Sequence, residues 1–466
     1  MYKRNALSLR LKRPVTASLS YMIAGAMTKL IGIISTPIFT RLLSGEEYGS
    51  YTLYMSYLGL ATTVAAASIS AQVLYRGFEK YKGEEEGFGY TALVVGESFS
   101  LLLSLIFIFT TSLTGLEADM IFALSLQLMT DTVLNLTFAR YRYKYNYRRI
   151  IYINLFTSAL SPLIAIALTV GAGVGYKGRV YALLGVSLIA VAPIAISTVR
   201  QGIEKFDRRK AIYIIKNSFP LIPNAAAAAL NAEIDKLMIS AHLGATALAK
   251  YSIAHTLGLG LGFLVTSLNS ALYPWVIRKL SANKTEQLIP LIRLILSSLG
   301  ALIMVLTSLV PEIFGLLAPT EYGSAKYASI PLALCAIPAF ATSFITTCIV
   351  YAEKSPYTTL SAAASALTSL MSSAILIPRF NYIGAGISLL LSNVIALFVN
   401  YILLYRCKMA RFISPKDVAT SFVLSAIFSI SCALCYPYLW ARILLLIIPS
   451  VIILNSIFSL KDYVTE

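Results

Sequence analysis

Fourteen long hydrophobic segments constrain the fold of this chain more than any other feature. Each has about 20 residues or a few more, the length at which an α-helix crosses the roughly 30 Å hydrocarbon core of a membrane. They predict transmembrane helices over Thr16–Thr40, Tyr48–Tyr75, Phe88–Ser112, Met120–Ala139, Ile150–Val170, Val180–Val199, Ala211–Ser240, Ala249–Val276, Leu288–Val310, Ala325–Val350, Tyr357–Ile377, Tyr382–Tyr405, Val418–Tyr436 and Arg442–Leu460. We therefore expect an all-α polytopic membrane protein with about 14 transmembrane helices.

Lysine and arginine alternate in number from one connection to the next. Basic residues accumulate in the cytoplasmic loops of membrane proteins. With the N-terminus inside, the cytoplasmic segments hold 28 of the 38 basic residues and the outer connections hold 7. The outer seven are Arg41, Lys177, Arg179, Lys250, Lys326, Arg379 and Arg442, and three lysines fall within the spans, Lys29, Lys216 and Lys236. This distribution predicts that both termini face the cytoplasm.

Composition excludes several functional classes. The net charge of +17 accompanies 58% hydrophobic residues, so it indicates topology and contact with anionic lipid rather than binding of nucleic acid. The five cysteines are scattered and the two histidines have no matching ligand cluster, so we expect no metal site. No connection exceeds about 20 residues, which leaves little room for an extramembrane catalytic domain. We therefore expect a transporter rather than an enzyme.

The first twelve spans form two sets of six, which insert with the same orientation when each set has an even number of helices. A weak internal sequence similarity follows spans one and seven, where Leu43 and Tyr51 align with Leu243 and Tyr251. We expect an N-lobe over residues 1–210, a C-lobe over residues 211–407 and two appended helices over residues 408–466.

Several short stretches resemble the polysaccharide transporter branch of the multidrug/oligosaccharidyl-lipid/polysaccharide flippase superfamily. They are Thr40-Arg41-Leu42-Leu43, Glu46-Glu47-Tyr48-Gly49-Ser50-Tyr51, Phe219-Pro220-Leu221-Ile222-Pro223, Ile234-Asp235-Lys236 and Tyr251-Ser252-Ile253-Ala254. The resemblance implies two six-helix lobes around a central cavity. It also implies export of undecaprenyl-pyrophosphate-linked oligosaccharide by alternating access across the bacterial cytoplasmic (inner) membrane, for O-antigen, capsule or exopolysaccharide biosynthesis.

The expected partners follow from this function. They are the lipid-linked oligosaccharide and membrane lipids, with a polysaccharide polymerase and a chain-length regulator, and no nucleic acid. We expect a monomer without a cofactor, and the energy source is left open between a proton and a sodium gradient.

Three cations are the candidates for binding the pyrophosphate: Lys29, Lys236 and Arg41. An ionisable group near the bilayer midplane costs at least about 2.5 kcal/mol, so each needs a partner or a water-filled cavity. Lys29 shares one helical face with Gly25 and Gly32, which is consistent with a cavity wall. Alternatively, the glycines allow close helix packing and Lys29 neutralises a carboxylate.

Four carboxylates are the candidates for ion coupling: Asp131, Glu97, Asp235 and Glu233. Burial disfavours the charged form of a carboxyl group, which suits such a group to carry a proton. The alternatives are a carboxylate held by hydrogen bonds or by Lys29, and an ion pair between Glu233 and Lys236. Pro220 and Pro223 are expected to bend span seven near its start.

Polar and aromatic side chains provide weaker sugar-binding candidates, Tyr51, Tyr54, Tyr251 and Asn231. Tyrosines also populate the interfacial belts of membrane proteins, which explains most of the 29 in this chain. The small polar residues of span eleven, Ser361, Ser365, Thr368 and Ser372, are expected to serve helix packing only.

Three alternative functions remain. A multidrug or toxin antiporter of the same superfamily is the nearest, although Lys29 disfavours the binding of cations. A lipid II flippase is the second, although the sequence lacks a dense basic cluster within its spans. A membrane polysaccharide polymerase is the third and needs a large outer loop that the spacing of the spans does not allow.

Overall fold

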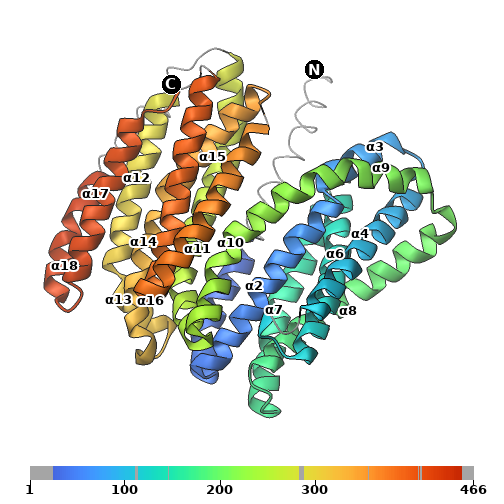
Figure 1. The fold of residues 1–466 in the computed structure, drawn as a ribbon, viewed down its shortest axis with the longest axis horizontal. Helices are drawn as coiled ribbons and strands as arrows, with labels where there is room; N and C mark the ends of the chain where they lie inside the picture. The colour runs from blue at the N-terminus through green and yellow to red at the C-terminus, as the bar shows by residue number, and fades with distance from the viewer. Residues whose placement is uncertain are drawn as a thin grey trace, which may run out of the picture. The chain divides into compact units, whose positions relative to one another are not determined.

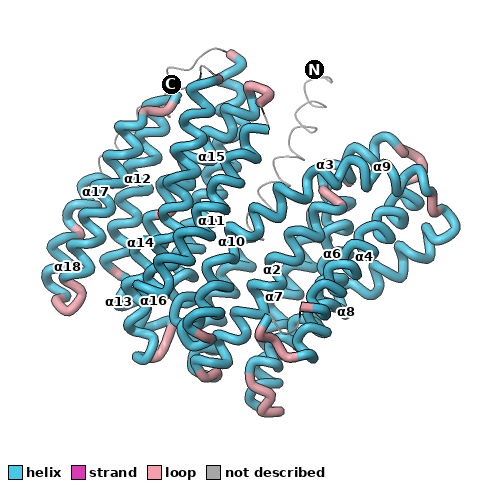
Figure 2. The backbone as a smooth tube through the Cα atoms, in the orientation of Figure 1, coloured by secondary structure: helices cyan, strands magenta, loops and turns pink. Residues whose placement is uncertain are grey.

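The computed structural model describes residues 25–110, 114–144, 146–282, 288–354, 356–407, 409 and 412–453, and these form helices joined by short connections (Figures 1 and 2). The N-terminal basic stretch, the start of span one and the end of span fourteen lie outside the described residues. The fold is that of an all-α polytopic membrane protein, as the sequence predicts. By compactness the chain divides into unit 1, Met1–Glu233, and unit 2, Ile234–Glu466. The expected lobe boundary after residue 210 concerns span topology and stays a prediction.

Unit 1 is a bundle of antiparallel helices with two shorter helices, α3 and α9, at one end (Figure 1). After a helix over residues 25–42, its elements are α2 (Gly45–Ser68), α3 (Ala71–Lys80), α4 (Glu85–Phe109), α6 (Ala118–Tyr143), α7 (Tyr147–Gly171), α8 (Tyr176–Gly202), η1 (Ile203–Lys205), α9 (Arg208–Ser218), η2 (Phe219–Leu221) and the first part of α10 (Ile222–Leu243). We call the end where α3 and α9 lie the α3 end. By the charge distribution, this end is the one expected to face the cytoplasm.

Helix α2 has well-defined ends. Ser44 caps its start, since the Glu47 amide donates to the Ser44 hydroxyl at 3.2 Å and the Ser44 amide donates to the Glu47 carboxylate at 2.9 Å. Span two was expected to continue to Tyr75, but α2 ends at Ser68 and a separate helix, α3, begins at Ala71. Two backbone-competing serines flank Ile69 at this break, and the charged face of α3 favours the membrane surface over the interior.

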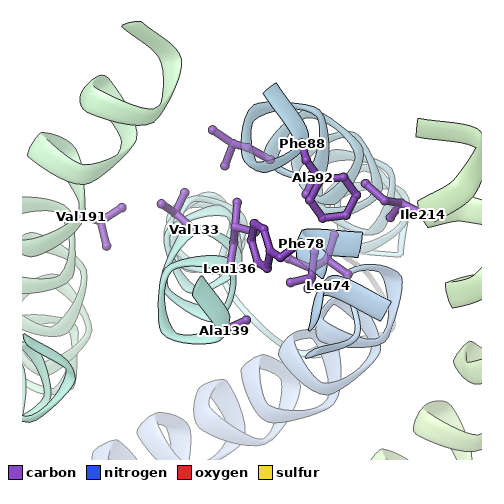
Figure 3. Close-up of a cluster of buried hydrophobic side chains, with 11 residues drawn as sticks. Leu74, Phe78, Phe88, Ala92, Val133, Leu136, Ala139, Val191 and Ile214 are labelled. Carbon is purple, nitrogen blue, oxygen red and sulfur yellow. The ribbon is translucent and has the colours of Figure 1, made fainter. Parts of the chain in front are cut away.

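The apolar core of unit 1 at the α3 end joins five helices. Its buried members are Ile69, Leu74, Phe78, Phe88, Ala92, Leu93, Val133, Leu136, Ala139, Val191 and Ile214 (Figure 3). The Phe78 and Phe88 rings meet edge to face with their centroids 5.2 Å apart. Gly77 makes this contact feasible, because a Cβ atom at that position would overlap the Phe88 ring. Aromatic packing therefore fixes α3 against α4.

Span seven is interrupted, as its prolines predict. It consists of α9, the 3-10 turn η2 and α10, and Pro220 lies within the turn. Proline lacks a backbone donor and clashes with the preceding turn of an α-helix, which accounts for the interruption.

Unit 2 contains the remaining spans. Its elements are the rest of α10, α11 (Ala245–Ser281), α12 (Leu288–Ser308), α13 (Val310–Leu317), η4 (Thr320–Ala328), α14 (Ser329–Leu334), α15 (Ala336–Tyr351), α16 (Pro356–Arg406), α17 (Pro415–Leu434) and α18 (Leu439–Leu445). Helix α16 contains two spans, because Asn381 takes the left-handed conformation at φ 54° and reverses the chain between them.

A polar seam holds the two halves of α16 together. The Ser361 and Ser365 hydroxyls donate to the carbonyl oxygens of Ala396 and Ser392 at 3.4 and 3.3 Å. Further along, Ser373 and Ser388 share a hydrogen bond of 2.7 Å. Small residues let helix backbones approach closely in a membrane, where interhelical hydrogen bonds add to the packing. The packing role expected for Ser361 and Ser365 is confirmed.

The two appended helices pack against α12 and α13. The buried Arg442 guanidinium, in the last turn of α18, forms a two-pronged ion pair with Glu312 of α13 at 2.6 and 2.7 Å and donates to the Ser308 carbonyl at 2.8 Å. Arg442 was counted with the outer connections by its sequence position, and this pair gives it a structural role.

The surfaces of the helices suit lipid. Within the described residues, ten helices are long and apolar enough to cross a membrane; α16 holds two expected spans, and span seven is interrupted. Large apolar side chains along these helices are exposed, among them Phe109, Phe122, Leu163, Leu367 and Leu434. Such exposure is expected where hydrocarbon, rather than water, is the solvent.

Candidate functional site

Asp131 belongs to a polar group inside unit 1, between α2, α6 and α8. Gln127 donates to the Asp131 carboxylate at 2.9 Å and to the Ser187 hydroxyl at 3.3 Å. Tyr54 lies within electrostatic range of Asp131, and its hydroxyl is buried without a hydrogen-bond partner among the described residues. The face of α6 that carries Gln127 and Asp131 therefore lies inside unit 1, whereas Asn135 is exposed.

Glu97 of α4 has a different environment. Both of its carboxylate oxygens are buried, and neither has a hydrogen-bond partner among the described residues. One turn further along α4, the Ser100 and Thr132 hydroxyls share a hydrogen bond of 2.7 Å, which joins α4 to α6. A buried carboxyl group without a partner is costly in its charged form, so Glu97 is suited to hold a proton.

The Arg179 guanidinium lies among three aromatic rings, a contact that its sequence position did not reveal. Its guanidinium carbon lies 3.8 Å from the centroid of the Tyr51 ring and 4.2 Å from that of Phe39, with Tyr48 at 5.7 Å. These distances are typical of cation–π contacts. Nη1 of Arg179 is buried and has no hydrogen-bond partner among the described residues. Tyr51, a sugar candidate, therefore has one face covered by a cation.

The pyrophosphate candidates Lys29 and Arg41 lie on the helix over residues 25–42. The Lys29 side chain is exposed, and Arg41 donates to the Pro37 carbonyl at 2.8 Å. No described atom lies within 4 Å of a Cβ atom built at Gly25 or Gly32. These glycines therefore do not mediate a close contact with another described helix, and the cavity interpretation of this face stays a prediction.

Glu233 lies at the end of unit 1. Its carboxylate packs against Gly59 of α2, since a Cβ atom at Gly59 would lie 3.1 Å from Oε1 of Glu233. The absence of a side chain at Gly59 leaves room for the Glu233 carboxylate beside α2.

Asp235 is the buried carboxylate of unit 2 and is only 1% exposed. It accepts a short hydrogen bond from the Tyr251 hydroxyl, and Tyr251 is itself fully buried. The Tyr251 and His255 rings lie 5.8 Å apart, and Lys236 lies within electrostatic range of both Asp235 and His255. Spans seven and eight therefore bring together an ion-coupling candidate, a sugar candidate and a cation candidate, while Asn231 lies one turn earlier on α10.

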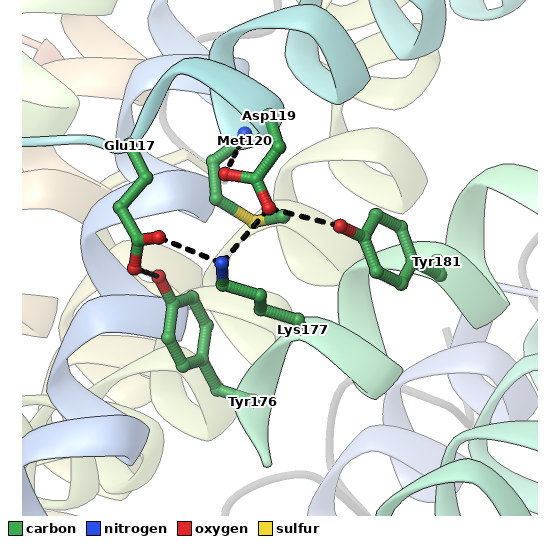
Figure 4. A network of polar contacts seen from close by, with 6 residues as sticks. All are labelled: Glu117, Asp119, Met120, Tyr176, Lys177 and Tyr181. Carbon is green, nitrogen blue, oxygen red and sulfur yellow. Dashed lines mark hydrogen bonds and ion pairs between the residues drawn. The ribbon is translucent and has the colours of Figure 1, made fainter. Parts of the chain in front are cut away.

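A second ionic network lies at the end of unit 1 opposite the α3 end (Figure 4). Lys177 of α8 pairs with Glu117 at 2.7 Å and with Asp119 at 2.8 Å, and Tyr181 donates to Asp119 at 3.0 Å. These groups are partly exposed, so the network joins the start of α6 to the start of α8 without burying charge deeply. Lys177, counted with the outer connections, thus has a structural role.

The chain matches one family of known proteins. Residues 15–280, more than half of the chain, match the family described as polysaccharide biosynthesis protein. A search of curated proteins finds no match.

Solved structures give the same fold. The inward closed conformation of the lipid II flippase MurJ is 16% identical with a TM-score of 0.73, covering 95% of this chain and 99% of that one. An inward-facing multidrug resistance MATE family transporter of the MOP superfamily is 13% identical with a TM-score of 0.66, covering 82% and 95%. A variant of the Vibrio cholerae MATE transporter VcmN is 15% identical with a TM-score of 0.55, covering 85% and 96%. The chain therefore belongs to the family of polysaccharide biosynthesis proteins.

Proposed function

We propose that the protein moves an undecaprenyl-pyrophosphate-linked oligosaccharide from the cytoplasmic to the outer leaflet of the bacterial cytoplasmic membrane, for O-antigen, capsule or exopolysaccharide biosynthesis. The observation that carries this proposal is the match of residues 15–280 to polysaccharide biosynthesis proteins in a chain with the fold of a lipid flippase. The protein breaks no bond in this process, since flipping requires only that the head group cross the membrane.

Cations inside the spans support a pyrophosphate head group. A charged phosphate enters a region of low dielectric constant cheaply only where positive charge compensates it. Lys29, Lys236 and Arg41 are assigned this role, with Tyr51, Tyr54, Tyr251 and Asn231 as the candidate sugar contacts. The polyprenyl tail remains in lipid while the head group crosses by alternating access.

Carboxyl groups inside the spans support coupling to an ion gradient. Glu97 and Asp131 in unit 1, with Asp235 and Glu233, are the candidates to bind and release the coupling ion. Glu97 suits a proton best, because its buried oxygens have no partner among the described residues to stabilise a permanent charge.

The proposal includes a topology. Both termini face the cytoplasm, because the α3 end of unit 1 belongs to the side that holds most of the basic residues. Reporter fusions to the connection after α3 and to the connection after α7 check this orientation, since only the first is expected to show cytoplasmic activity.

Reconstitution of the purified protein into vesicles tests the function. Labelled lipid-linked oligosaccharide is incorporated, and its accessibility to a membrane-impermeant glycan-modifying reagent is followed on each leaflet. We expect accessibility to change faster than in protein-free vesicles. Movement of a quaternary ammonium dye without movement of the glycan lipid would contradict the proposal and indicate an antiporter.

A lipid II flippase is the second candidate, because the structure aligns with MurJ over nearly the full length of both chains. Lipid II in a parallel set of vesicles separates the two. Selective movement of lipid II would establish this candidate in place of the first.

A further inference from the structure

A basic pocket lies at the α3 end of unit 1, apart from the groups assigned to transport. Its volume is about 210 Å³, and it is lined by α4, α6, α8, the first turn of α7 and the flanking residues Lys144 and Asn146. The polar residues that bear on its chemistry are Arg140, Tyr141, Lys144, Asn146, Arg149 and Gln201. By sequence position, its three cations Arg140, Lys144 and Arg149 indicate only topology.

The three cations of this pocket have no carboxylate ion-pair partner in the described part of the chain. Among the described residues, none of Arg140, Lys144 and Arg149 forms an ion pair with an aspartate or a glutamate, although the Arg149 guanidinium lies 5.6 Å from the centroid of the Tyr141 ring. Glu86 acts on Arg140 and Lys144 electrostatically, but it is engaged by Lys205 at 2.6 Å. Three cations around one small cavity repel each other unless an anion compensates them.

Three hydroxyl groups of the pocket donate hydrogen bonds within their own helices and are not available as donors to a ligand. The hydroxyls of Ser197 and Thr198 both donate to the Ile194 carbonyl at 2.9 Å, and Thr137 donates to the Val133 carbonyl at 2.7 Å. These hydroxyls are therefore occupied as donors within their own helices. The guanidinium, ammonium and amide groups and the Tyr141 hydroxyl remain as donors toward a ligand, which matches the needs of phosphate oxygens.

The floor of the pocket is fixed by the apolar core. Leu93, Val133 and Leu136 line the pocket and also belong to the buried cluster of Figure 3. The cations line the same pocket as these apolar residues. Because the pocket lies at the ends of membrane-spanning helices, we expect its charges at the depth of the lipid head groups. Basic pockets between transmembrane helices on the cytoplasmic side commonly bind phosphorylated head groups.

We propose that this pocket binds the phosphate group of an anionic membrane lipid. Two sources share this chemistry, a phospholipid head group and the pyrophosphate of a polyprenyl lipid. The site is separate from Lys29, Lys236 and Arg41, so it goes beyond the proposed function and does not require it.

Native mass spectrometry of the full-length protein in detergent tests this site. The protein is titrated with phosphatidylglycerol, with a polyprenyl pyrophosphate and with zwitterionic phosphatidylcholine. We expect the wild-type protein to retain one anionic lipid in preference to phosphatidylcholine. Preference for phosphatidylglycerol or for the pyrophosphate then identifies the source, and either supports the site.

Two triple variants separate the pocket from surface charge in general. Arg140→Gln, Lys144→Gln and Arg149→Gln together remove the pocket cations. Arg76→Gln, Lys82→Gln and Arg148→Gln remove the same charge from exposed positions outside the pocket lining. We expect the pocket variant to bind the anionic lipid about tenfold more weakly or worse, the scale of losing charged hydrogen bonds, and the surface variant to bind within about twofold of wild type. Equal losses in both would overturn the proposal.

A cavity-filling variant keeps the test independent of folding defects in the triple variant. Thr198→Trp fills the pocket and leaves every charge in place. We expect it to lose the anionic lipid while circular dichroism and the elution volume match wild type. Undiminished lipid binding by a folded Thr198→Trp protein would also overturn the proposal.

Discussion

Carboxyl groups inside the helices of unit 1 have two distinct environments. Asp131 accepts a hydrogen bond from Gln127, and this link was predictable because the two residues are four apart on one helix. Glu97 has two buried oxygens without a partner among the described residues. Its position in an apolar span was predictable, but its lack of a partner was not, because that depends on side chains of other helices.

The Glu97→Met variant tests whether this unpartnered carboxyl group serves transport rather than stability. Methionine has a similar volume and removes a buried polar group that has no hydrogen-bond partner, so the melting temperature should stay equal or rise. Gradient-driven movement of the glycan lipid should fall in the same variant. A stable Glu97→Met protein that retains wild-type response to an imposed proton gradient would remove Glu97 from the coupling site.

A second prediction concerns the ion pair between Arg442 and Glu312. Glu312→Gln leaves the buried guanidinium without its charged partner and should destabilise the protein by about 2 kcal/mol, the scale of such a loss. Glu321→Gln, at an exposed position on η4, is the matched control and should have little effect. Thermal unfolding in detergent measures both, and equal melting temperatures for the two variants would contradict the prediction.

The same pair should make stability depend on pH. The hydrogen bond from Arg442 holds the pKa of Glu312 below its ordinary value of 4.5. A depressed pKa in the folded state contributes stability that is fully present above the unfolded-state pKa and is lost as pH falls through the folded-state value. The difference in melting temperature between wild type and Glu312→Gln should therefore be constant above about pH 5 and shrink at lower pH. A difference that persists unchanged at pH 3 would assign the effect to something other than charge.

The hydrophobic pattern alone does not predict every break between helices. The interruption of span seven was predictable from Pro220 and Pro223. The end of α2 at Ser68 was not, because Tyr75 and its neighbours in α3 continue an apolar pattern. What fixes α3 is its packing against α4, α6 and α9, a tertiary interaction that depends on residues beyond the α2–α3 segment.

Gly77 provides the test of this contact. A Cβ atom there overlaps the Phe88 ring, so Gly77→Ala should destabilise the protein by about 1 to 3 kcal/mol, the usual scale of overpacking. Gly89→Ala is the control, since no described atom lies within 4 Å of its Cβ position and alanine favours a helix. Melting temperatures of the two variants should therefore diverge. If Gly77→Ala proves as stable as Gly89→Ala, the close contact between α3 and α4 is not as described.

At the scale of the whole molecule, the fold follows from the number and length of the apolar segments, and the family match agrees with it. The polar contacts between distant helices do not follow. Arg179 over Phe39 and Tyr51, Lys177 with Glu117, and Arg442 with Glu312 join residues 60 to 140 positions apart, and no local pattern specifies such partners. Their assignment to the outer connections stays a prediction about topology, and it carries no information about contacts.

In the proposed function, lysine side chains inside the spans bind the pyrophosphate while the linked glycan crosses the membrane. The most direct measurement compares Lys29→Ala with Lys216→Ala, an exposed lysine on α9 outside the proposed site, in vesicles with labelled lipid-linked oligosaccharide. Loss of one charged contact predicts a fall in flipping rate of roughly tenfold or more for Lys29→Ala, with Lys216→Ala near wild type and Lys29→Arg retaining part of the activity. A wild-type rate for a correctly inserted Lys29→Ala protein would contradict the claim.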